Sequence, residues 1–246
     1  MDKDKTGWIK DVHRFLGYGN PKASLVFMGL EEGGSEEDYP NDSERGEFAD
    51  LATYIKSSEH CLAKIRTPVW RLAAALALKL LEPEQCVLTE TVRDYRLNHL
   101  GRTNGETLLV ELRAFRRPNQ GGKYSLNQFS SRELALSEQA HKERHARLKS
   151  LFDRSHPKYV ICYGKGAKGA FEEFWNLPPN EWSAVPISRH VVKLAPTAWR
   201  GVVALIPFLG RGGILAYSDV ADVGARIKTE RERILATPAE AGGLEG

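Results

Sequence analysis

The sequence predicts an α/β protein, a three-layer α/β/α sandwich around a central four-stranded parallel sheet. Short runs of apolar and β-branched residues alternate along the chain with longer stretches of helical pattern, as in parallel strands joined by helices. The apolar runs are nearly continuous, as expected for strands that are covered on both faces. The chain has 246 residues, of which 41% are hydrophobic, and this suits one domain with a sizeable core.

Buried strands are predicted where short apolar runs are bounded by Gly, Pro or charge, at 23–29, 107–115, 159–164 and 202–208. Residues 191–194 are expected to form a further strand at a sheet edge. Helices are predicted at 68–81, 131–152, 168–175 and 218–235. Thr67 and Pro68 begin the first of these helices with a capping hydroxyl followed by proline at the first helical position. We expect one domain over 1–236 and a disordered polar tail at 237–246.

Composition favours a cytoplasmic protein that has no membrane partner, and we expect a monomer. No apolar run approaches the roughly 20 residues that a bilayer requires, and the first residues do not resemble a signal peptide. Cys86 and Cys162 lie in apolar contexts and are predicted as buried core residues. His141 and His145 do not follow the metalloprotease order, so a solvated helix face is predicted there. We therefore expect no metal site.

The net charge is +3, but the charges are unevenly distributed. Residues 31–50 carry nine acids and one base, whereas residues 182–218 carry four bases and no acid. An acidic pocket edge beside a basic face suits an enzyme that acts on nucleic acid. Ordinary solvated surface charge explains the same distribution equally well.

Glycines and polar residues follow the predicted strands, and ligands of open α/β sheets bind beyond the carboxyl ends of strands. The first strand ends in Gly29-Leu30-Glu31-Glu32-Gly33-Gly34, where glycines permit close approach of a ligand. The alternative is a solvated turn. Glu111 lies in the second strand, where burial of a carboxylate is costly without a partner. It either contacts a ligand or forms a structural ion pair with an arginine.

The third strand runs into Gly164-Lys165-Gly166-Ala167-Lys168-Gly169, which has the Gly-x-Gly-x-x-Gly spacing of dinucleotide sites. The acid expected about 20 residues later is absent, because that region reads Ser188-Arg189-His190. A contact between this turn and a DNA phosphate is therefore favoured over a nucleotide cofactor.

The order, spacing and strand context of these motifs resemble those of the uracil-DNA glycosylase superfamily, over roughly residues 13–228. Gly29 matches the first glycine of that family's first motif, and Glu31 takes the position of a water-positioning Asp or Asn. Glu32 departs from the family, since it replaces a proline. The turn after the fourth strand also departs, because it lacks the family's histidine. The nearest histidine, His190, precedes that strand.

The resemblance implies a DNA glycosylase-like hydrolase without metal or organic cofactor. It would flip a uracil or modified base out of single- or double-stranded DNA and cleave its N-glycosidic bond. The predicted catalytic residues are Glu31 and Glu32. The predicted substrate-binding residues are Gly29, Leu30, Tyr39, Phe48, Glu111 and Phe208, with Phe48, or Tyr39 in its place, stacking on the base. The predicted DNA-binding residues are Arg113, Arg116, Lys165, Leu209, Gly210, Arg211 and Gly212, with Leu209 as a wedge in the duplex.

The missing histidine leaves three alternatives, because loss of a donor on the departing base costs about 2.7–4 kcal/mol. In the first, another donor replaces the histidine, namely Arg211, Lys165 or the backbone N–H groups of 210–213. In the second, the target is a damaged or modified base that leaves easily. In the third, the protein binds DNA without cutting it. Two other functions therefore stay open beside the glycosylase. One is a non-catalytic nucleic-acid binding or sensing protein on the same fold, and the other is a nucleotide-binding enzyme that uses the Gly164 turn.

Overall fold

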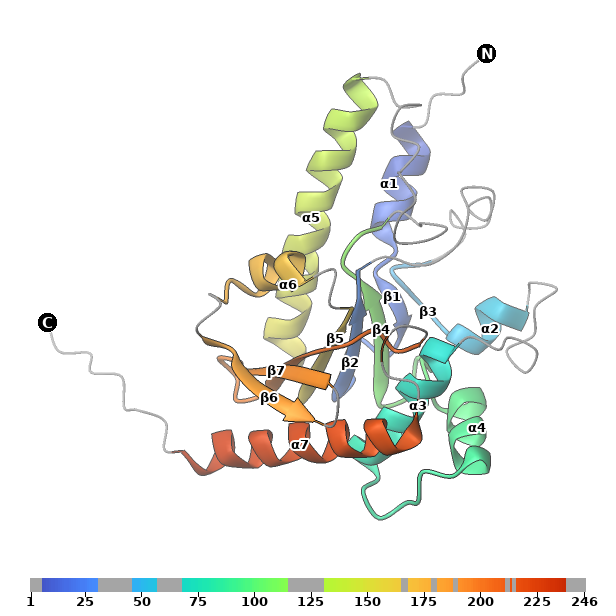
Figure 1. Ribbon diagram of the computed structural model, residues 1–246. Coiled ribbons are helices and arrows are strands. Elements are labelled where there is room, and N and C mark those ends of the chain that lie inside the picture. The colour runs from blue at the N-terminus through green and yellow to red at the C-terminus, as the bar shows by residue number, and fades with distance from the viewer. Residues whose placement is uncertain are drawn as a thin grey trace, which may run out of the picture.

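The computed structural model describes residues 6–30, 46–56, 68–114, 131–164, 168–177, 181–187, 190–210, 213 and 216–237. Within these residues the chain forms one mixed sheet of eight strands with helices packed on it (Figure 1). The strands are β1 (Gly17–Gly19), β2 (Leu25–Gly29), β3 (Phe48–Ala49), β4 (Thr107–Glu111), β5 (Tyr159–Tyr163), β6 (Ser183–Ile187), β7 (His190–Pro196) and β8 (Val202–Ile206). The helices are α1 (Thr6–Arg14), α2 (Leu51–Lys56), α3 (Pro68–Leu81), α4 (Thr89–Asn98), α5 (Ser131–Ser155), α6 (Lys168–Trp175) and α7 (Tyr217–Ala236).

The strand order is β3-β1-β4-β2-β5-β8-β7-β6. The four predicted strands are β4, β2, β5 and β8, and they are parallel neighbours at the centre, which confirms the α/β class and the parallel core. The sheet is larger than predicted, because β1, β3 and β6 belong to it beside the parallel core and the predicted strand at 191–194. β1 and β7 extend the core in antiparallel pairing, and β3 and β6 form the two edges. β7 includes residues 191–194 and is an inner strand rather than an edge.

Helices cover both faces of the sheet, and strand alternation assigns each side chain to a face. Phe27, Leu109 and Ile161 point to one face and pack with residues of α3, α4 and α7. Val110 and Cys162 point to the other face, where they pack with residues of α5 and α6. Burial on both faces explains the continuous apolar runs of the central strands.

Of the two cysteines that were predicted to be buried, the structure confirms one. Cys162 is buried, as predicted, whereas Cys86 is exposed in the segment between α3 and α4. The prediction for Cys86 is wrong because the apolar residues beside it do not belong to a strand or helix. None of the helices in the described ranges is long and apolar enough to span a bilayer.

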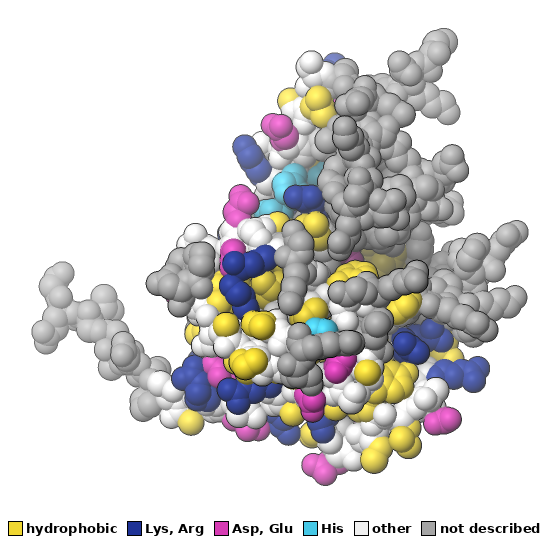
Figure 2. Space-filling model, viewed as in Figure 1, with side chains coloured by type: hydrophobic (Ala, Val, Ile, Leu, Met, Phe, Trp, Pro, Cys, Tyr) yellow, Lys and Arg dark blue, Asp and Glu magenta, His cyan; other side chains and the backbone are white. Residues whose placement is uncertain are grey.

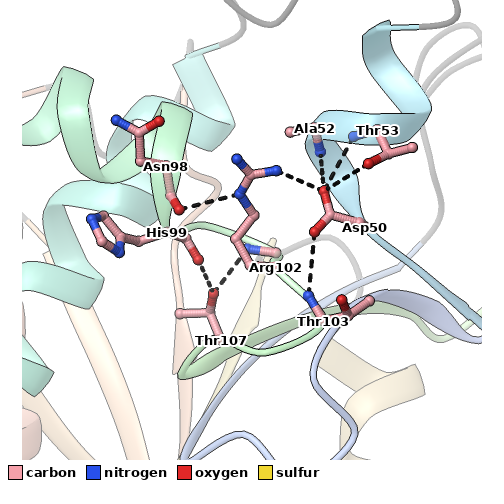
Figure 3. A network of polar contacts seen from close by, with 9 residues as sticks. Asp50, Ala52, Thr53, Asn98, His99, Arg102, Thr103 and Thr107 are labelled. Carbon is pink, nitrogen blue, oxygen red and sulfur yellow. Dashed lines mark hydrogen bonds and ion pairs between the residues drawn. The ribbon is translucent and has the colours of Figure 1, made fainter.

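A polar network joins the start of α2 to the segment between α4 and β4 (Figure 3). Asp50 accepts hydrogen bonds from the backbone N–H groups of Ala52 and Thr53, and so caps the start of α2. Arg102, which follows α4, donates to the same carboxylate at 2.7 Å. Burial alone would raise the pKa of Asp50, but the bonds from Arg102, Thr53 and Thr103 lower it below the ordinary value.

Arg144 is a buried arginine whose guanidinium binds backbone carbonyls. It is 2% exposed and donates from Nε and Nη2 to the carbonyl of Glu111, at 3.1 and 2.7 Å. The same guanidinium donates to the carbonyls of His13, Phe15 and Leu16, which connect α1 to β1. One side chain of α5 therefore ties the end of β4 to the start of β1.

Three histidines, His13, His141 and His145, lie beside Arg144. The prediction of a solvated face for His141 and His145 is wrong, because both are half-buried. His141 and His145 are half-buried on α5 with ring centroids 4.1 Å apart, and buried His13 of α1 lies 6.4 Å from His141. Figure 2 shows histidine side chains next to Lys and Arg over α5. Burial, with the charge of Arg144, lowers the pKa of His13 to about 3, and burial with His141 lowers that of His145 to about 4. No group in the described residues has the arrangement of a metal site.

Arg144→Met is expected to destabilise the fold by at least ~3 kcal/mol, because it leaves several buried carbonyls without donors. Urea unfolding measures this. Arg154→Met is the matched control, since Arg154 is an exposed residue of the same helix whose guanidinium bonds to the helix backbone at Ser150. Its loss should stay near 0.5 kcal/mol or below. Equal losses for the two variants would contradict the role given to Arg144.

Stability is expected to fall as the pH drops below about 6.5. The unfolded chain binds a proton at His13 near pH 6.5, while the folded chain resists it until about pH 3. The stabilisation is thus complete above pH 6.5 and is lost at up to ~1.4 kcal/mol per pH unit on acidification. His13→Gln should flatten the stability curve between pH 7 and 5 in urea unfolding, and His99→Gln, which alters an exposed side chain, should leave it unchanged.

Candidate functional site

The order of the parallel strands creates a crevice at their carboxyl ends. After β2 the chain forms β4 on one side of it and then β5 on the other. In open α/β sheets the crevice at such a reversal, outside the carboxyl ends, is where ligands bind. The carboxyl ends of β2, β4 and β5 therefore define the candidate site.

Three residues form a row across these strand ends on one face of the sheet. Gly29 pairs in register with Glu111, and the register of β2 with β5 continues to Tyr163. The Tyr163 hydroxyl donates a hydrogen bond to Oε1 of Glu111 at 3.2 Å, so the two side chains meet above Gly29. A Cβ on Gly29 would lie 2.1 Å from Oε2 of Glu111 and 2.6 Å from the Tyr163 hydroxyl. Glycine is needed at this position because the polar pair fills the space.

A cavity opens beside this row and has mixed walls. Glu111, Tyr163 and Arg113 supply polar groups. Its aromatic lining residues are Phe15, Tyr18 and Trp70, together with the Tyr163 ring. Trp70 comes from the first turn of α3, which lies over this face of the sheet. Arg144 also lines the cavity, and it holds the backbone of the cavity wall by donating to the Glu111 carbonyl.

Phe208 lies at the same edge, on the side away from β4. Its ring centroid is 6.3 Å from that of Tyr163, and it packs on the face that carries Tyr163. The following Gly210 is buried with φ at +153°, a conformation that favours glycine, and Pro68 at the start of α3 packs close to it. The turn after β8 and the start of α3 thus border the site together.

The structure brings several predicted site residues together. Gly29, Glu111, Arg113 and Phe208 lie at one edge of the sheet, near the same crevice. The alternative of an ion pair between an arginine and the Glu111 side chain is not what Arg144 provides, because Arg144 binds the backbone carbonyl of Glu111.

Phe48 and Leu30 lie elsewhere. Both are half-buried and pack with the cluster on the opposite face of the sheet from Glu111. Phe48 is in β3 and pairs with Gly17, which separates it from β2 by two intervening strands. This position suits a core aromatic better than the predicted stacking residue, because the sheet stands between Phe48 and the cavity.

Leu209 does not suit the predicted wedge. It is 0% exposed and belongs to the core that α3 and α7 cover, whereas a residue that enters a DNA duplex has to be exposed. Glu31, Glu32, Tyr39, Arg116, Lys165, Arg211 and Gly212 lie outside the described residues.

Sequence reasoning missed Tyr163, Trp70 and Arg144. Tyr163 shares a strand with Tyr159 and Ile161 and alternates with them toward one face, a signal that the sequence contains. Trp70 reads as an ordinary core residue of α3, and Arg144 as one of many charges on α5. Only tertiary packing distinguishes these two residues from their neighbours.

Gly29→Ala is expected to destabilise the protein by ~1–3 kcal/mol, since its methyl group would overlap Glu111 and Tyr163. The penalty should shrink in a Glu111→Ala background, because that change frees the space. Chemical unfolding of the single and double variants measures the coupling. Gly7→Ala is the control, since a methyl group at this α1 position meets nothing within 4 Å and should be neutral or stabilising. Additive effects of the two changes would show that Gly29 and Glu111 do not compete for space.

No protein-family model matches the chain, and no curated protein matches its sequence. The site combines several kinds of chemical group. These are a carboxylate and a phenol at the strand ends, aromatic walls and an arginine, on a fold that places ligands at this edge.

Proposed function

We propose that the protein is a DNA glycosylase-like hydrolase that flips a uracil or modified base out of DNA and cleaves its N-glycosidic bond. The single observation that carries the proposal is the Glu111–Tyr163 pair above Gly29, at the carboxyl edge between β4, β2 and β5. A finer part of the proposal is that the fold is the one of the uracil-DNA glycosylase superfamily, with the base pocket at this edge.

The site has the groups that a flipped base requires. An extruded base is held by hydrogen bonds to its edge and by stacking on aromatic or apolar side chains. The Glu111 carboxylate accepts hydrogen bonds, and the Tyr163 hydroxyl both donates and accepts them. Trp70 and Phe15 offer rings in the cavity, and Phe208 offers one beside Tyr163. These rings replace Phe48 in the proposed stacking role.

Glu111 restricts the class of base. An ionised carboxylate only accepts hydrogen bonds, so it favours a base edge that presents an amino or imino donor. Arg113, in the same cavity lining, offers a positive group for a phosphate of the distorted strand. A modified base with an exocyclic amino group therefore fits Glu111 better than a base without hydrogen-bond donors does.

The proposed chemistry takes place on the sugar side of the pocket. Cleavage passes through an oxocarbenium-like sugar, which a nearby carboxylate stabilises and an aligned water attacks. Glu31 and Glu32 follow Leu30 at the end of β2, so in this proposal Glu31 positions the water and Glu32 assists. The strand that precedes them ends at the crevice, beside Glu111 and Tyr163.

A non-catalytic nucleic-acid binding protein is the second candidate, because the same pocket captures a base without needing to cut it. Glu31→Gln separates the two. For an enzyme, the change should abolish base release and leave DNA affinity intact, because it removes the charge that stabilises the sugar cation. For a binding protein, neither the native chain nor the variant releases a base.

The decisive experiment incubates the protein with single- and double-stranded oligonucleotides that carry uracil or different modified bases. Abasic sites are scored by alkaline cleavage. We expect release of at least one base, and Glu111→Gln should reduce kcat/KM for it by roughly 5- to 150-fold, the equivalent of one lost buried hydrogen bond. If Glu111→Gln released the base at the native rate, the proposal that Glu111 binds the edge of the base would be contradicted.

Glu84→Gln is the matched control for that variant. Glu84 is exposed and lies beyond the C-terminal end of α3, and that end is about 16 Å along the helix from Trp70 in the cavity wall. The same change from acid to amide there should leave base release as it is in the native protein. No release from any substrate, combined with tight DNA binding, would replace the glycosylase by the binding protein.

A further inference from the structure

A second cavity lies at the opposite edge of the sheet from the candidate site. Its volume is about 260 Å³, and its walls come from α5, the end of α6 and the turn between β7 and β8 (Figure 1). That turn leads into the amino end of β8, whereas the candidate site lies at the carboxyl ends of the strands. The five residues of β8 span ~15 Å, so a ligand in this cavity would not compete with one in the crevice.

Four aromatic rings line this second cavity, those of Phe152, Phe174, Trp175 and Trp199. The ring centroids of Phe152 and Trp175 lie 5.4 Å apart with the planes 18° from parallel, and those of Trp175 and Trp199 lie 6.2 Å apart with the planes at 54°. Both indoles are half-buried, so part of each ring stays accessible. Tryptophan is enriched at binding interfaces because its ring offers a large, rigid surface. The two inclined indoles provide a corner in which a planar ligand can stack on one ring and place its edge against the other.

The turn between β7 and β8 holds Trp199 in one position. Its Nε1 donates a hydrogen bond to the carbonyl of Pro157 at 2.9 Å, and the ring of His156 stacks on it with the centroids 6.0 Å apart. The Thr197 hydroxyl accepts a hydrogen bond from the N–H of Gly201 at 2.7 Å and so closes the turn. A Cβ on Gly201 would lie 2.8 Å from Nε1 of Trp199, so glycine lets the indole approach the backbone. Because the indole is fixed before a ligand arrives, binding does not have to order it.

Lys149 and Asp153 add opposite charges to the cavity wall, about one turn apart on α5. Nζ of Lys149 lies 5.6 Å from the centroid of the Phe174 ring. Because a cation already lies against one aromatic wall, a ligand that brings an anionic group is favoured over a second cation. The Asp153 carboxylate accepts hydrogen bonds from amino or imino groups of a ligand. A planar ring that has donors on its edge and an anionic group attached is the chemistry of a nucleotide.

We infer that this cavity is a second binding site, and that its ligand is a nucleotide with a guanine base. The base stacks on the indoles of Trp175 and Trp199. Lys149 binds the phosphate, and Asp153 accepts hydrogen bonds from the edge of the base. Guanine is favoured because its adjacent imino and amino donors meet both oxygens of one carboxylate, whereas the other common bases place an acceptor beside each donor. Among the described residues the linings of the two cavities have no member in common, so this site does not depend on the glycosylase proposed above.

Isothermal titration calorimetry of the full chain tests the site with GMP, AMP, guanosine and a short oligothymidine that carries one central guanine. We expect saturable binding of GMP, with AMP weaker. Trp199→Ala should weaken GMP binding by about 5- to 150-fold, the range for a base stacked on an aromatic ring. Tighter binding of the oligonucleotide than of GMP would assign the site to an unpaired nucleotide of single-stranded DNA. Tighter binding of GMP would assign it to a free nucleotide, and both results support the same site chemistry.

Two exposed side chains give variants that separate phosphate binding from base recognition. Lys149→Gln should weaken GMP binding by about 2- to 5-fold and leave the binding of guanosine, which has no phosphate, unchanged. Asp153→Asn should reduce the preference for GMP over AMP. Lys142→Gln is the matched control, because Lys142 is an exposed lysine of the same helix that does not line the cavity. It should bind GMP as the native protein does.

No binding of GMP or of the oligonucleotide, or equal GMP affinity in the native protein, Trp199→Ala and Lys149→Gln, would overturn the site. Tighter binding of a quaternary ammonium ion such as choline would also overturn it, as would loss of GMP binding in Glu111→Gln, which would place the nucleotide in the crevice. Thermal unfolding checks Trp199→Ala, and Lys149→Gln carries the comparison if that variant does not fold. Absence of base release from every oligonucleotide would contradict the glycosylase and leave this site unaffected.

Discussion

The geometry of the carboxyl edge depends on the buried guanidinium of Arg144. A guanidinium offers five N–H donors in a rigid fork, and Arg144 uses them on carbonyls of three segments. These carbonyls lie at the end of α1, in the link from α1 to β1 and at the end of β4, so one side chain of α5 joins α1 to strands that also pair in the sheet. The backbone of Glu111 is among them. The backbone at Glu111 is therefore held by a residue of α5, while the Glu111 carboxylate accepts its hydrogen bond from Tyr163.

Parallel strands make this edge chemically different from the rest of the sheet. Their interiors are apolar on both faces, and the polar side chains appear where the strands end. Because register aligns those ends, Glu111 and Tyr163 arrive at one level on one face, with Gly29 between them. The missing Cβ of Gly29 and the hydrogen bond above it are two aspects of one arrangement. A larger residue in the middle strand would separate the pair.

Buried polar groups are concentrated at or near this edge. Glu111 with Tyr163, His190 with Asp219, and the histidines beside Arg144 all carry a desolvation cost that apolar residues would avoid. The groups differ in how they meet that cost. His13 stays neutral, because burial and a neighbouring cation lower its pKa to about 3. In the Glu111–Tyr163 and His190–Asp219 pairs, the two polar side chains instead lie within 4 Å of each other, so each faces another polar group at the crevice.

The sequence by itself determined the central strands and most of the long helices, because apolar periodicity and proline or glycine boundaries are local signals. It also predicted that Gly29 and Glu111 lie at the strand ends, where the structure pairs them. Tertiary structure decided which strands adjoin, their register and the face that each side chain occupies. Strand alternation fixes faces only relative to other residues of the same strand. For that reason the sequence did not show that Phe48 packs on the face of the sheet opposite Tyr163. Nor did it show that His190 and Tyr163, which are 27 residues apart, lie at one edge of the sheet.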